Sequence, residues 1–303
     1  MSIIKKQELS ENIELLAAQR RMYSKAKNIM GFQMLLSGPI AFCSVIMAIL
    51  FPDFKGYIAL WGILVILLDI FVFTQWIKIL RENAAKIQEL FDTHVFGLDW
   101  NEIAVGKRPE PELIHEEAKS YCFSKVKKTS LNKWYPAIIN DVPDIFAVII
   151  CQRSNVWWDA RVRKRYLLFI CMTLVLIAVG LIGYSIFVRK DVFDFLAFIV
   201  APIASTYVFG YRQMVEQRDA VERLNKLKEA SEKIWTEALG GESVSKLWTK
   251  CRSLQDQIFD HRKRNPPTFD FLFKWFRDEN ESLMNKGAEV LVQQYKNSLL
   301  NQP

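Results

Sequence analysis

Residues 151–166, CQRSNVWWDARVRKRY, lead directly into the apolar residues 167–188 and decide the fold. A membrane span needs about 20 apolar residues to cross roughly 30 Å of hydrocarbon. The cationic, tryptophan-containing stretch therefore stands at the border between a soluble region and a membrane helix. It could anchor the helix at the bilayer surface, bind a ligand, or hold a soluble domain against the span.

Four apolar stretches of the chain are long enough to cross a membrane. They are Ile29–Phe51, Tyr57–Ile77, Tyr166–Val188 and Val192–Tyr211. The connections 52–56 and 189–191 are short, so the stretches predict two transmembrane hairpins. The 303-residue chain is 51% hydrophobic, and a soluble protein rarely combines that share with four long uncharged stretches. Residues 1–28 show no apolar core of a signal peptide.

The basic residues indicate how the spans are oriented. Segment 1–28 holds six Lys and Arg, 78–165 holds fifteen and 212–303 holds sixteen, whereas the two hairpin turns hold one and two. Because positively charged loops stay in the cytoplasm, both termini and the middle region are expected there. The net charge of +7 fits this orientation and attraction to anionic lipid headgroups, and it also fits an anionic ligand.

The cytoplasmic segments have helical periodicity. Apolar residues recur every three or four positions from Ile77 to Phe91 and again from Val221 to Leu239, so spans two and four are expected to continue as helices into the cytoplasm. Gly240-Gly241 should end the second of these helices. The last helix, near 281–300, is expected to present a face with four residues, namely Leu283, Gly287, Val290 and Gln294.

We therefore expect an all-α, polytopic membrane protein with four transmembrane helices and a helical cytoplasmic domain. Its expected parts are a cytoplasmic N-terminal amphipathic helix (1–28), a first hairpin (29–77), a cytoplasmic helical region (78–165), a second hairpin (166–211) and a cytoplasmic helical C-terminal region (212–303). Ile145–Cys151 (IFAVIIC) predicts a buried core helix or a membrane-dipping segment. Phe269–Phe276 (FDFLFKWF) fits core packing, a membrane-surface helix or an oligomer contact.

Enzyme and metal motifs are not found in the sequence. None of the five cysteines forms a CxxC pair, and the three histidines are widely spaced. His115-Glu116-Glu117 is not a metalloprotease motif, because Lys119 stands where the second histidine is required. The chain also has no Walker loop, GxGxxG or GxSxG. We expect no catalytic residue, no metal and no cofactor.

Asp69 lies near the middle of the second span, where an ionisable group is costly unless it meets water or a partner. It could be a protonated or hydrogen-bonded structural residue, with Ser205 and Thr206 offering hydroxyls at similar depth. It could instead line an aqueous path. Four helices pack into a solid bundle, so a pore would need several copies, and a ring of Asp69 would favour cations. Pro39 and Pro202 permit kinks in spans one and four.

Two interpretations of the opening stretch account for different residues. Trp157, Arg161 and Arg165 share a helical face and fit an interfacial anchor, in which tryptophan lies at headgroup level and arginine reaches the surface. Anchoring does not require the other polar residues, which are Gln152, Arg153, Asn155 and Asp159. We expect Asn155 to cap this helix and Asp159 to pair with Arg163 four residues later.

The sequence is similar to the SMODS-associated four-transmembrane effectors, a bacterial family of pore-forming effectors. The opening stretch resembles the family's signature. The other similar stretches are LLAAQRRMYSKAK before span one, FDTHVFGLDWN after span two, NKWYP before IFAVIIC, and LQDQIFDHRKRNPP near the C-terminus. The resemblance covers nearly the whole chain and includes the layout of two hairpins.

This resemblance implies a role in antiphage defence at the bacterial inner (cytoplasmic) membrane. A cyclic oligonucleotide from a partner cGAS-like nucleotidyltransferase would switch a homo-oligomer in the lipid bilayer to a permeabilising state, and no nucleic acid polymer would be bound. The motif positions carried over, as ligand-binding or latch residues, are Gln152, Arg153, Asn155, Trp158, Asp159 and Arg163, together with Gln255, Asp256 and Arg262. The alternative is a non-conducting membrane scaffold or oligomerisation protein.

Overall fold

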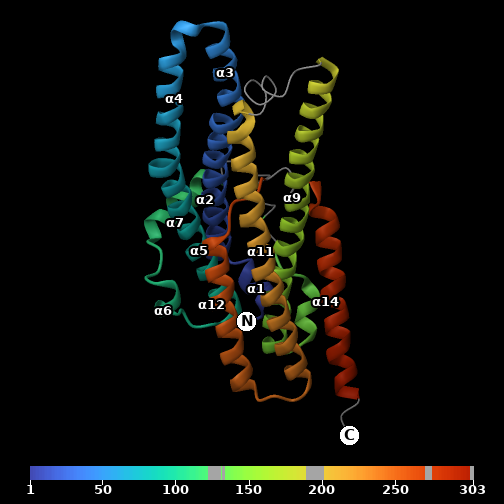
Figure 1. The fold of residues 1–303 in the computed structure, drawn as a ribbon. Coiled ribbons are helices and arrows are strands. Elements are labelled where there is room, and N and C mark those ends of the chain that lie inside the picture. The colour runs from blue at the N-terminus through green and yellow to red at the C-terminus, as the bar shows by residue number, and fades with distance from the viewer. Residues whose placement is uncertain (122–130, 132–133, 189–200, 270–274, 301–303) are drawn as a thin grey trace.

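A computed structural model describes residues 1–303 apart from 122–130, 132–133, 189–200, 270–274 and 301–303. Every regular element in the described part is a helix, as predicted. Figure 1 shows two pairs of long helices whose axes are roughly aligned. The chain termini lie at one end and the α3–α4 hairpin at the other. The residues of the opening stretch, 151–166, lie in the half that contains the termini.

The N-terminal half consists of two long helical columns joined by a tight turn. The first column contains α1 (Ile3–Gln7), α2 (Ser10–Leu35), the π-helical turn η1 (Leu36–Ile40) and α3 (Ala41–Leu50). A short 3-10 turn, η2 (Pro52–Phe54), leads into the second column, which contains α4 (Lys55–Leu68), the π-helical turn η3 (Asp69–Phe73) and α5 (Thr74–Phe96). The expected N-terminal helix therefore runs on into the first apolar stretch without a break.

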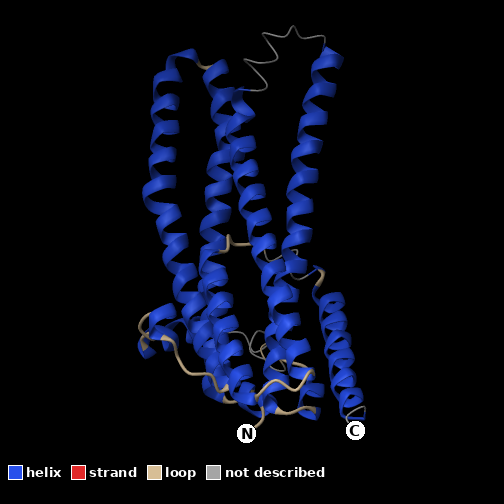
Figure 2. Cartoon of the chain, turned by 60° about the horizontal axis from the view of Figure 1, so that its bottom comes forward, coloured by secondary structure: helices blue, strands red, loops and turns tan. Residues whose placement is uncertain are grey.

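The second half is built on two more long helices. Short elements come first: α6 (Glu102–Val105), α7 (Pro111–Tyr121) and the 3-10 turn η4 (Ala137–Asp141). They are followed by α9 (Asp144–Val188), α11 (Ala201–Leu239), α12 (Val244–Arg264) and α14 (Arg277–Leu300). At 1.5 Å per residue, the 45 residues of α9 span roughly 70 Å. In Figures 1 and 2, α14 runs along α9 at the edge of the molecule.

The hydrophobic core lies in the half that holds the termini. Leu16 of α2, Phe91 of α5 and Ile149 of α9 are fully buried there, together with Leu254 of α12. Residues 145–151 form the first turns of α9, and the core contains Ile145 and each residue from Ala147 to Cys151. This stretch is therefore a buried core segment, as predicted, although it belongs to the same helix as the third apolar stretch.

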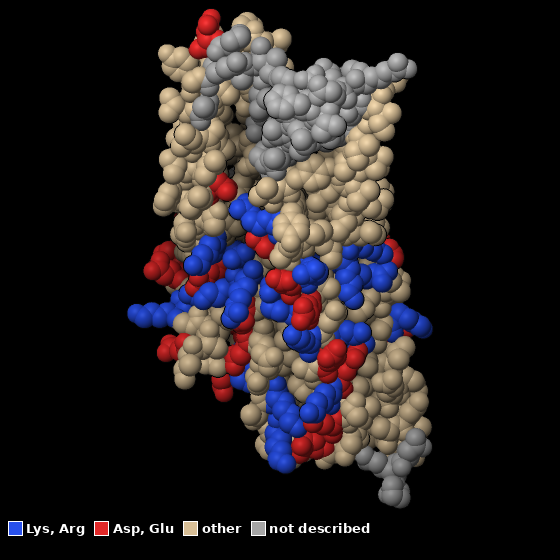
Figure 3. All heavy atoms as spheres, viewed as in Figure 1, with Lys and Arg blue, Asp and Glu red and all other residues tan. Residues whose placement is uncertain are grey.

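Among the described residues, the opposite half carries few charges. In Figure 3, Lys, Arg, Asp and Glu crowd the lower half of the face shown, and few of them lie among the described residues of the upper half. Within the described residues, one helix, Gly56–Phe96, is long and apolar enough to cross a membrane, and only 12% of its apolar window is buried. The predicted turn 189–191 and the start of the fourth predicted span lie outside the described residues.

Two local predictions were wrong. Asn155 caps no helix, because α9 begins eleven residues earlier at Asp144 and Asn155 is an interior residue. The buried face of α14 includes Asn280 and Ala288, whereas Leu283 and Val290 of the predicted face are 41% and 48% exposed. The Phe269–Phe276 stretch lies mostly outside the described residues.

Candidate functional site

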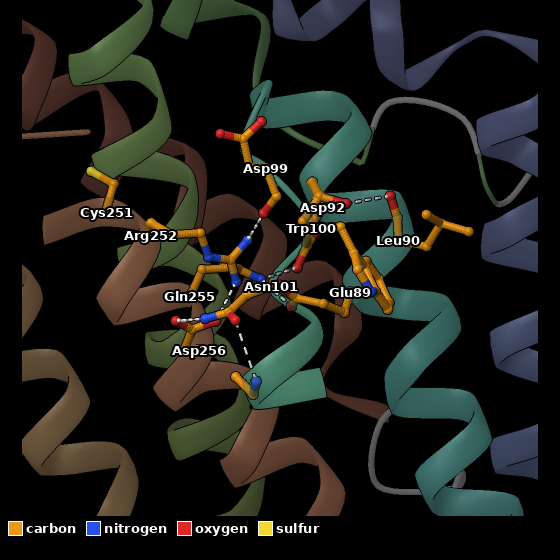
Figure 4. Close-up of polar contacts among 12 residues, drawn as sticks. Glu89, Leu90, Asp92, Asp99, Trp100, Asn101, Cys251, Arg252, Gln255 and Asp256 are labelled. Carbon is orange, nitrogen blue, oxygen red and sulfur yellow. Dashed lines mark hydrogen bonds and ion pairs between the residues drawn. The ribbon is translucent and has the colours of Figure 1, made fainter. Parts of the chain in front are cut away.

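A buried polar network joins α5, α9 and α12 at the centre of the charged half. We call it the stalk network and define it by Glu89, Asp92, Gln152, Arg252, Gln255 and Arg262. Residues three or seven apart share a helical face, so Glu89 and Asp92 of α5 point toward Arg252, Gln255 and Arg262 of α12. Figure 4 shows the α5 and α12 side chains converging from the two helices.

Gln255 is the central member of the stalk network. Its Nε2 donates to Glu89 Oε2 at 2.8 Å and to Asp92 Oδ2 at 3.1 Å, while its Oε1 accepts from Gln152 Nε2 at 3.0 Å. Gln152 Nε2 also donates to the carbonyl oxygen of Cys251 at 2.9 Å. Both glutamines are completely buried. One side chain of α12 therefore ties α9 to α5.

Two guanidinium groups balance the two buried carboxylates. Arg252 Nη2 lies 2.6 Å from Glu89 Oε1, and Arg262 Nη1 lies 2.6 Å from Asp92 Oδ2. Burial raises the pKa of Glu89, and its hydrogen bond from Arg252 offsets part of this rise. Burial disfavours the charge on Arg262, but Asp92 and Glu89 outweigh it and raise the pKa of the guanidinium. The two carboxylates, 0% and 1% exposed, are too buried for solvent to replace a missing guanidinium group.

Polar side chains extend the network at both edges. Asp256 accepts hydrogen bonds from Arg252 Nη2 at 2.8 Å and from Asn101 Nδ2 at 2.9 Å. On the other side, Asn155 Nδ2 donates to the Tyr135 hydroxyl at 2.9 Å, and that hydroxyl donates to Asp92 Oδ1 at 3.1 Å. Burial raises the pKa of Tyr135 well above its usual value, so the hydroxyl remains a donor.

A second polar group, the junction group, lies where α9, α11 and the end of α12 meet. It consists of Asp159, Arg163, Gln217, His261 and Asn265. Arg163 Nε lies 2.9 Å from Asp159 Oδ1, and Arg163 Nη1 donates to Gln217 Oε1 at 2.8 Å and to the carbonyl of Pro266 at 3.0 Å. Asp159 Oδ2 also contacts His261 Nε2 and Asn265 Nδ2, both at 3.1 Å. The predicted pairing of Asp159 with Arg163 is confirmed.

The charges of the junction group stabilise one another. Burial alone would raise the pKa of Asp159, but Arg163 and the hydrogen bond from His261 hold it well below its ordinary value. Burial lowers the pKa of His261, and the neighbouring Asp159 opposes that change. Asp159 is therefore a carboxylate at neutral pH, and it fixes Arg163 against the segment that follows α12.

The remaining arginines of the opening stretch connect α9 to α11 and α14. Arg153 Nη2 lies 3.2 Å from Glu232 Oε1 of α11. Arg161 and Arg165 both reach Glu279 of α14, at 2.6 Å and 2.7 Å. Their guanidinium groups also lie over aromatic rings, those of Trp157 and Phe276 respectively. Trp158 is partly buried on the same helix.

Asp69 lies apart from both groups and has two partners from other helices. Gln33 Nε2 of α2 donates a hydrogen bond to Asp69 Oδ1. Arg212 Nη2 of α11 lies 3.8 Å from Asp69 Oδ2. Arg212 follows the fourth predicted span directly, so the basic partner enters from the charged half. The side chains of Ser205 and Thr206 lie outside the part of the structure that can be described.

A sequence model of the SMODS-associating 4TM effector domain matches residues 1–291. The chain belongs to this family. A protein of Bacillus cereus (strain VD146), described as a probable CBASS effector molecule, is 26% identical to it over 312 residues, covering 98% of this chain and 100% of that protein. No solved structure matches the chain. Family membership confirms the resemblance found in the sequence and makes the chain a membrane protein.

In this 4TM effector, the sequence-predicted residues separate into distinct places. Gln152, Gln255 and Arg262 meet in the stalk network, with Asp256 and Asn155 at its edges. Asp159 and Arg163 form the junction group. Arg153 and Trp158 belong to neither group, and Asp69 lies near the apolar half. Among the described residues, no group of three or more His, Cys, Asp or Glu could hold a metal ion.

Sequence reasoning missed the acidic partners of the stalk network and the partner of Asp69. Glu89 is two residues from both Ile87 and Phe91, so it lies on the side of α5 opposite their apolar stripe, where periodicity predicts contact with solvent. The pattern therefore did not indicate that Glu89 is buried. Arg212 had a weak signal, its position at the end of a predicted span. Glu279 had none, because its partners are more than 110 residues away in the sequence.

Proposed function

We propose that this protein is a CBASS effector, a membrane effector of bacterial antiphage defence. In this proposal it oligomerises and permeabilises the inner membrane when a cyclic oligonucleotide from a partner nucleotidyltransferase acts on its cytoplasmic helices. Membership in the SMODS-associating 4TM effector family and the similarity to a probable CBASS effector molecule support this role. We assign four spans, 29–51, 57–77, 166–188 and 192–211, with both termini in the cytoplasm.

The observation that carries the proposal is the continuity of helices between the two halves. Gly56–Phe96 includes the second predicted span and ends beyond Glu89 and Asp92. Helix α9 begins before Gln152 and continues through the third predicted span to Val188. Because Gln255 ties these helices together below the bilayer, a movement of α12 would move both spans.

The contacts favour a latch role over a ligand-binding role for the candidate residues. Gln152, Gln255 and Arg262 are buried and already bonded within the chain, so a ligand would have to displace strong, charge-assisted hydrogen bonds to reach them. In this proposal these residues, with Asp159 and Arg163, transmit a conformational change from the cytoplasmic helices to the membrane spans. A ligand can drive opening only if it binds the open state more tightly than the closed one.

In the same proposal, several copies form the conducting path. Four helices fill their own bundle, and α4 leaves large apolar side chains exposed, including Leu60, Ile63 and Ile66, each at least 56% exposed. These residues would face lipid or a second copy. Asp69 would enter the path in the open assembly and favour cations.

The test is leakage of dye and potassium from liposomes that contain the purified protein, with a panel of cyclic di- and trinucleotides. Leakage that one nucleotide triggers would support the effector role and identify the signal. Arg163→Ala should then reduce the response, and the exposed Arg218→Ala should not. Silence of correctly inserted protein across the panel would contradict direct gating by a nucleotide and favour the non-conducting scaffold.

A further inference from the structure

Two π-helical turns interrupt the first hairpin, one in each of its columns. Turn η1 (Leu36–Ile40) contains Pro39 and separates α2 from α3, while η3 (Asp69–Phe73) separates α4 from α5. A π-helical turn holds one residue more than the α-helix allows, and such turns are frequent at functional sites. The outer part of the hairpin, residues 41–68, is thus joined to the rest of the protein through a π-helical turn at each end.

A polar contact lies beside both turns. Asp69, the first residue of η3, accepts a hydrogen bond from Gln33 of α2, which precedes η1 by three residues. Arg212 of α11 lies 3.8 Å from the other carboxylate oxygen. Helix α11 also packs against η1 and α3. The rings of Phe32 and Phe73, 5.7 Å apart, complete the contact between α2 and η3.

The contact of Asp69 with Gln33 and Arg212 can hold in one conformation of η3 and break in another. Gln33 is 5% exposed, and the Asp69 side chain is 19% exposed next to the apolar half, so neither can exchange its partner freely for water. If η3 became an ordinary α-helix, the turn would no longer hold an extra residue. The regular helix would then rotate α4 by about 100° relative to α5. Asp69 would then leave Gln33 and Arg212.

We propose that Gln33, Asp69 and Arg212 form a latch that holds the outer hairpin in the resting state, and that opening requires Asp69 to leave this latch. Gln33 and Arg212 are positioning residues in this account, and the two π-helical turns are the joints that the latch secures. The inference rests on the proposed permeabilising function, since it assigns the resting contact that opening must break.

The first experiment measures spontaneous dye leakage from liposomes without any nucleotide. Asp69→Asn should raise it roughly tenfold or more, the population shift expected on losing the carboxylate that holds both partners. Arg212→Gln removes only an ion pair at 3.8 Å from a half-exposed arginine, so it should raise leakage about two- to fivefold. Arg218→Gln, an exposed arginine on the same helix, is the matched control and should leak like the unmodified protein. Circular dichroism and gel filtration would verify that each variant is folded.

A covalent lock gives an independent measurement. In a Gln33→Cys/Asp69→Cys variant, a short bifunctional methanethiosulfonate reagent should link the two positions and suppress leakage. Reduction should cleave the link and leave a leaky protein, because Asp69 is absent. The unmodified protein, which keeps its native cysteines, receives the same reagents as the control and should not change.

The outcomes separate the latch from the proposed function. If a nucleotide opens the unmodified protein while Asp69→Asn and Arg212→Gln remain as silent as the control, the latch is wrong and the effector role stands. If both variants leak, the latch is supported whether or not a nucleotide in the panel is active. If no variant leaks under any condition, both the latch and the permeabilising function are overturned.

Discussion

Helices α12 and α4 show how differently the two halves of the molecule are held together. On α12, Arg252, Gln255 and Arg262 each bond to α5, and His261 bonds to α9. Helix α4 carries large apolar side chains that remain exposed, and its apolar window is only 12% buried. Directional polar pairs therefore fix the charged half, whereas the apolar half depends on helix packing and on the contacts of Asp69.

The largest expected loss of stability comes from removing one partner of a buried ion pair in the charged half. Arg262→Ala leaves Asp92 without its guanidinium in a site that water does not reach, so it should lower the free energy of unfolding by about 3–5 kcal/mol. Thermal unfolding of the detergent-solubilised protein would measure it. Arg264→Ala on the same helix removes an exposed pair with Asp260 and should cost at most about 1 kcal/mol. Equal losses would contradict the comparison.

In the apolar half, a larger side chain should destabilise the protein where two helices approach closely. A Cβ on Gly210 of α11 would lie 2.7 Å from Leu174 Cδ2 of α9, and small residues allow such approach in membranes. Gly210→Leu should destabilise the pair by about 1–3 kcal/mol through overpacking. Gly62→Ala, where a Cβ meets nothing within 4 Å, is the control. An unchanged unfolding temperature for Gly210→Leu would show that this contact is loose.

The edge of the body should respond more weakly than its centre. Glu279→Gln removes the charge that Arg161 and Arg165 share, but the Glu279 side chain is 48% exposed, so the unfolding temperature should change little. The first turns of α14 should nevertheless exchange amide hydrogens faster, as hydrogen–deuterium exchange would show. The neighbouring Asp278→Asn serves as the control. Unchanged exchange in both variants would mean that other contacts hold α14.

The smallest effect should be a pH dependence of the junction group. Burial lowers the folded-state pKa of His261 below its ordinary 6.5, with Asp159 opposing this change and Arg163 and Arg223 adding to it. The unfolded state then binds a proton more readily, so this contribution to stability is present above 6.5 and is lost as the pH falls from that value through the lower folded-state pKa. Unfolding temperatures should decrease less on acidification in His261→Gln. A steeper decrease in the variant would contradict this assignment.

The long helices were predicted well because the apolar periodicity and the glycines that define them lie within each helical segment. Periodicity extended the second apolar stretch into α5, and Gly240-Gly241 placed the end of α11 at Leu239, where the structure has it. The same reasoning failed for Asn155. A capping residue needs a helix start beside it, and the apolar run 145–151 instead belongs to the same helix.

The functional contacts were harder to predict because their partners are distant in the sequence. Gln255 and Glu89 are 166 residues apart, and nothing local in either segment identifies the other. The buried face of α14 was mistaken for a similar reason. The buried positions of α14 are Asn280, Ala288, Leu291 and Val292, and Asn280 accepts a hydrogen bond of 2.9 Å from Arg161, which is 119 residues away in the sequence. Residue type indicated that the opening stretch was special, but only the fold gives its partners.

The central claim is that the stalk network transmits a signal from the charged half to the predicted spans. The most direct test compares nucleotide-triggered potassium leakage for the unmodified protein and for Gln152→Met, which cuts the bond between α9 and Gln255 and leaves every predicted span intact. Gln293→Met, on the exposed surface of α14, is the control. The account predicts that Gln152→Met inserts and folds but loses most of the triggered leakage. A response equal to that of the control would contradict it.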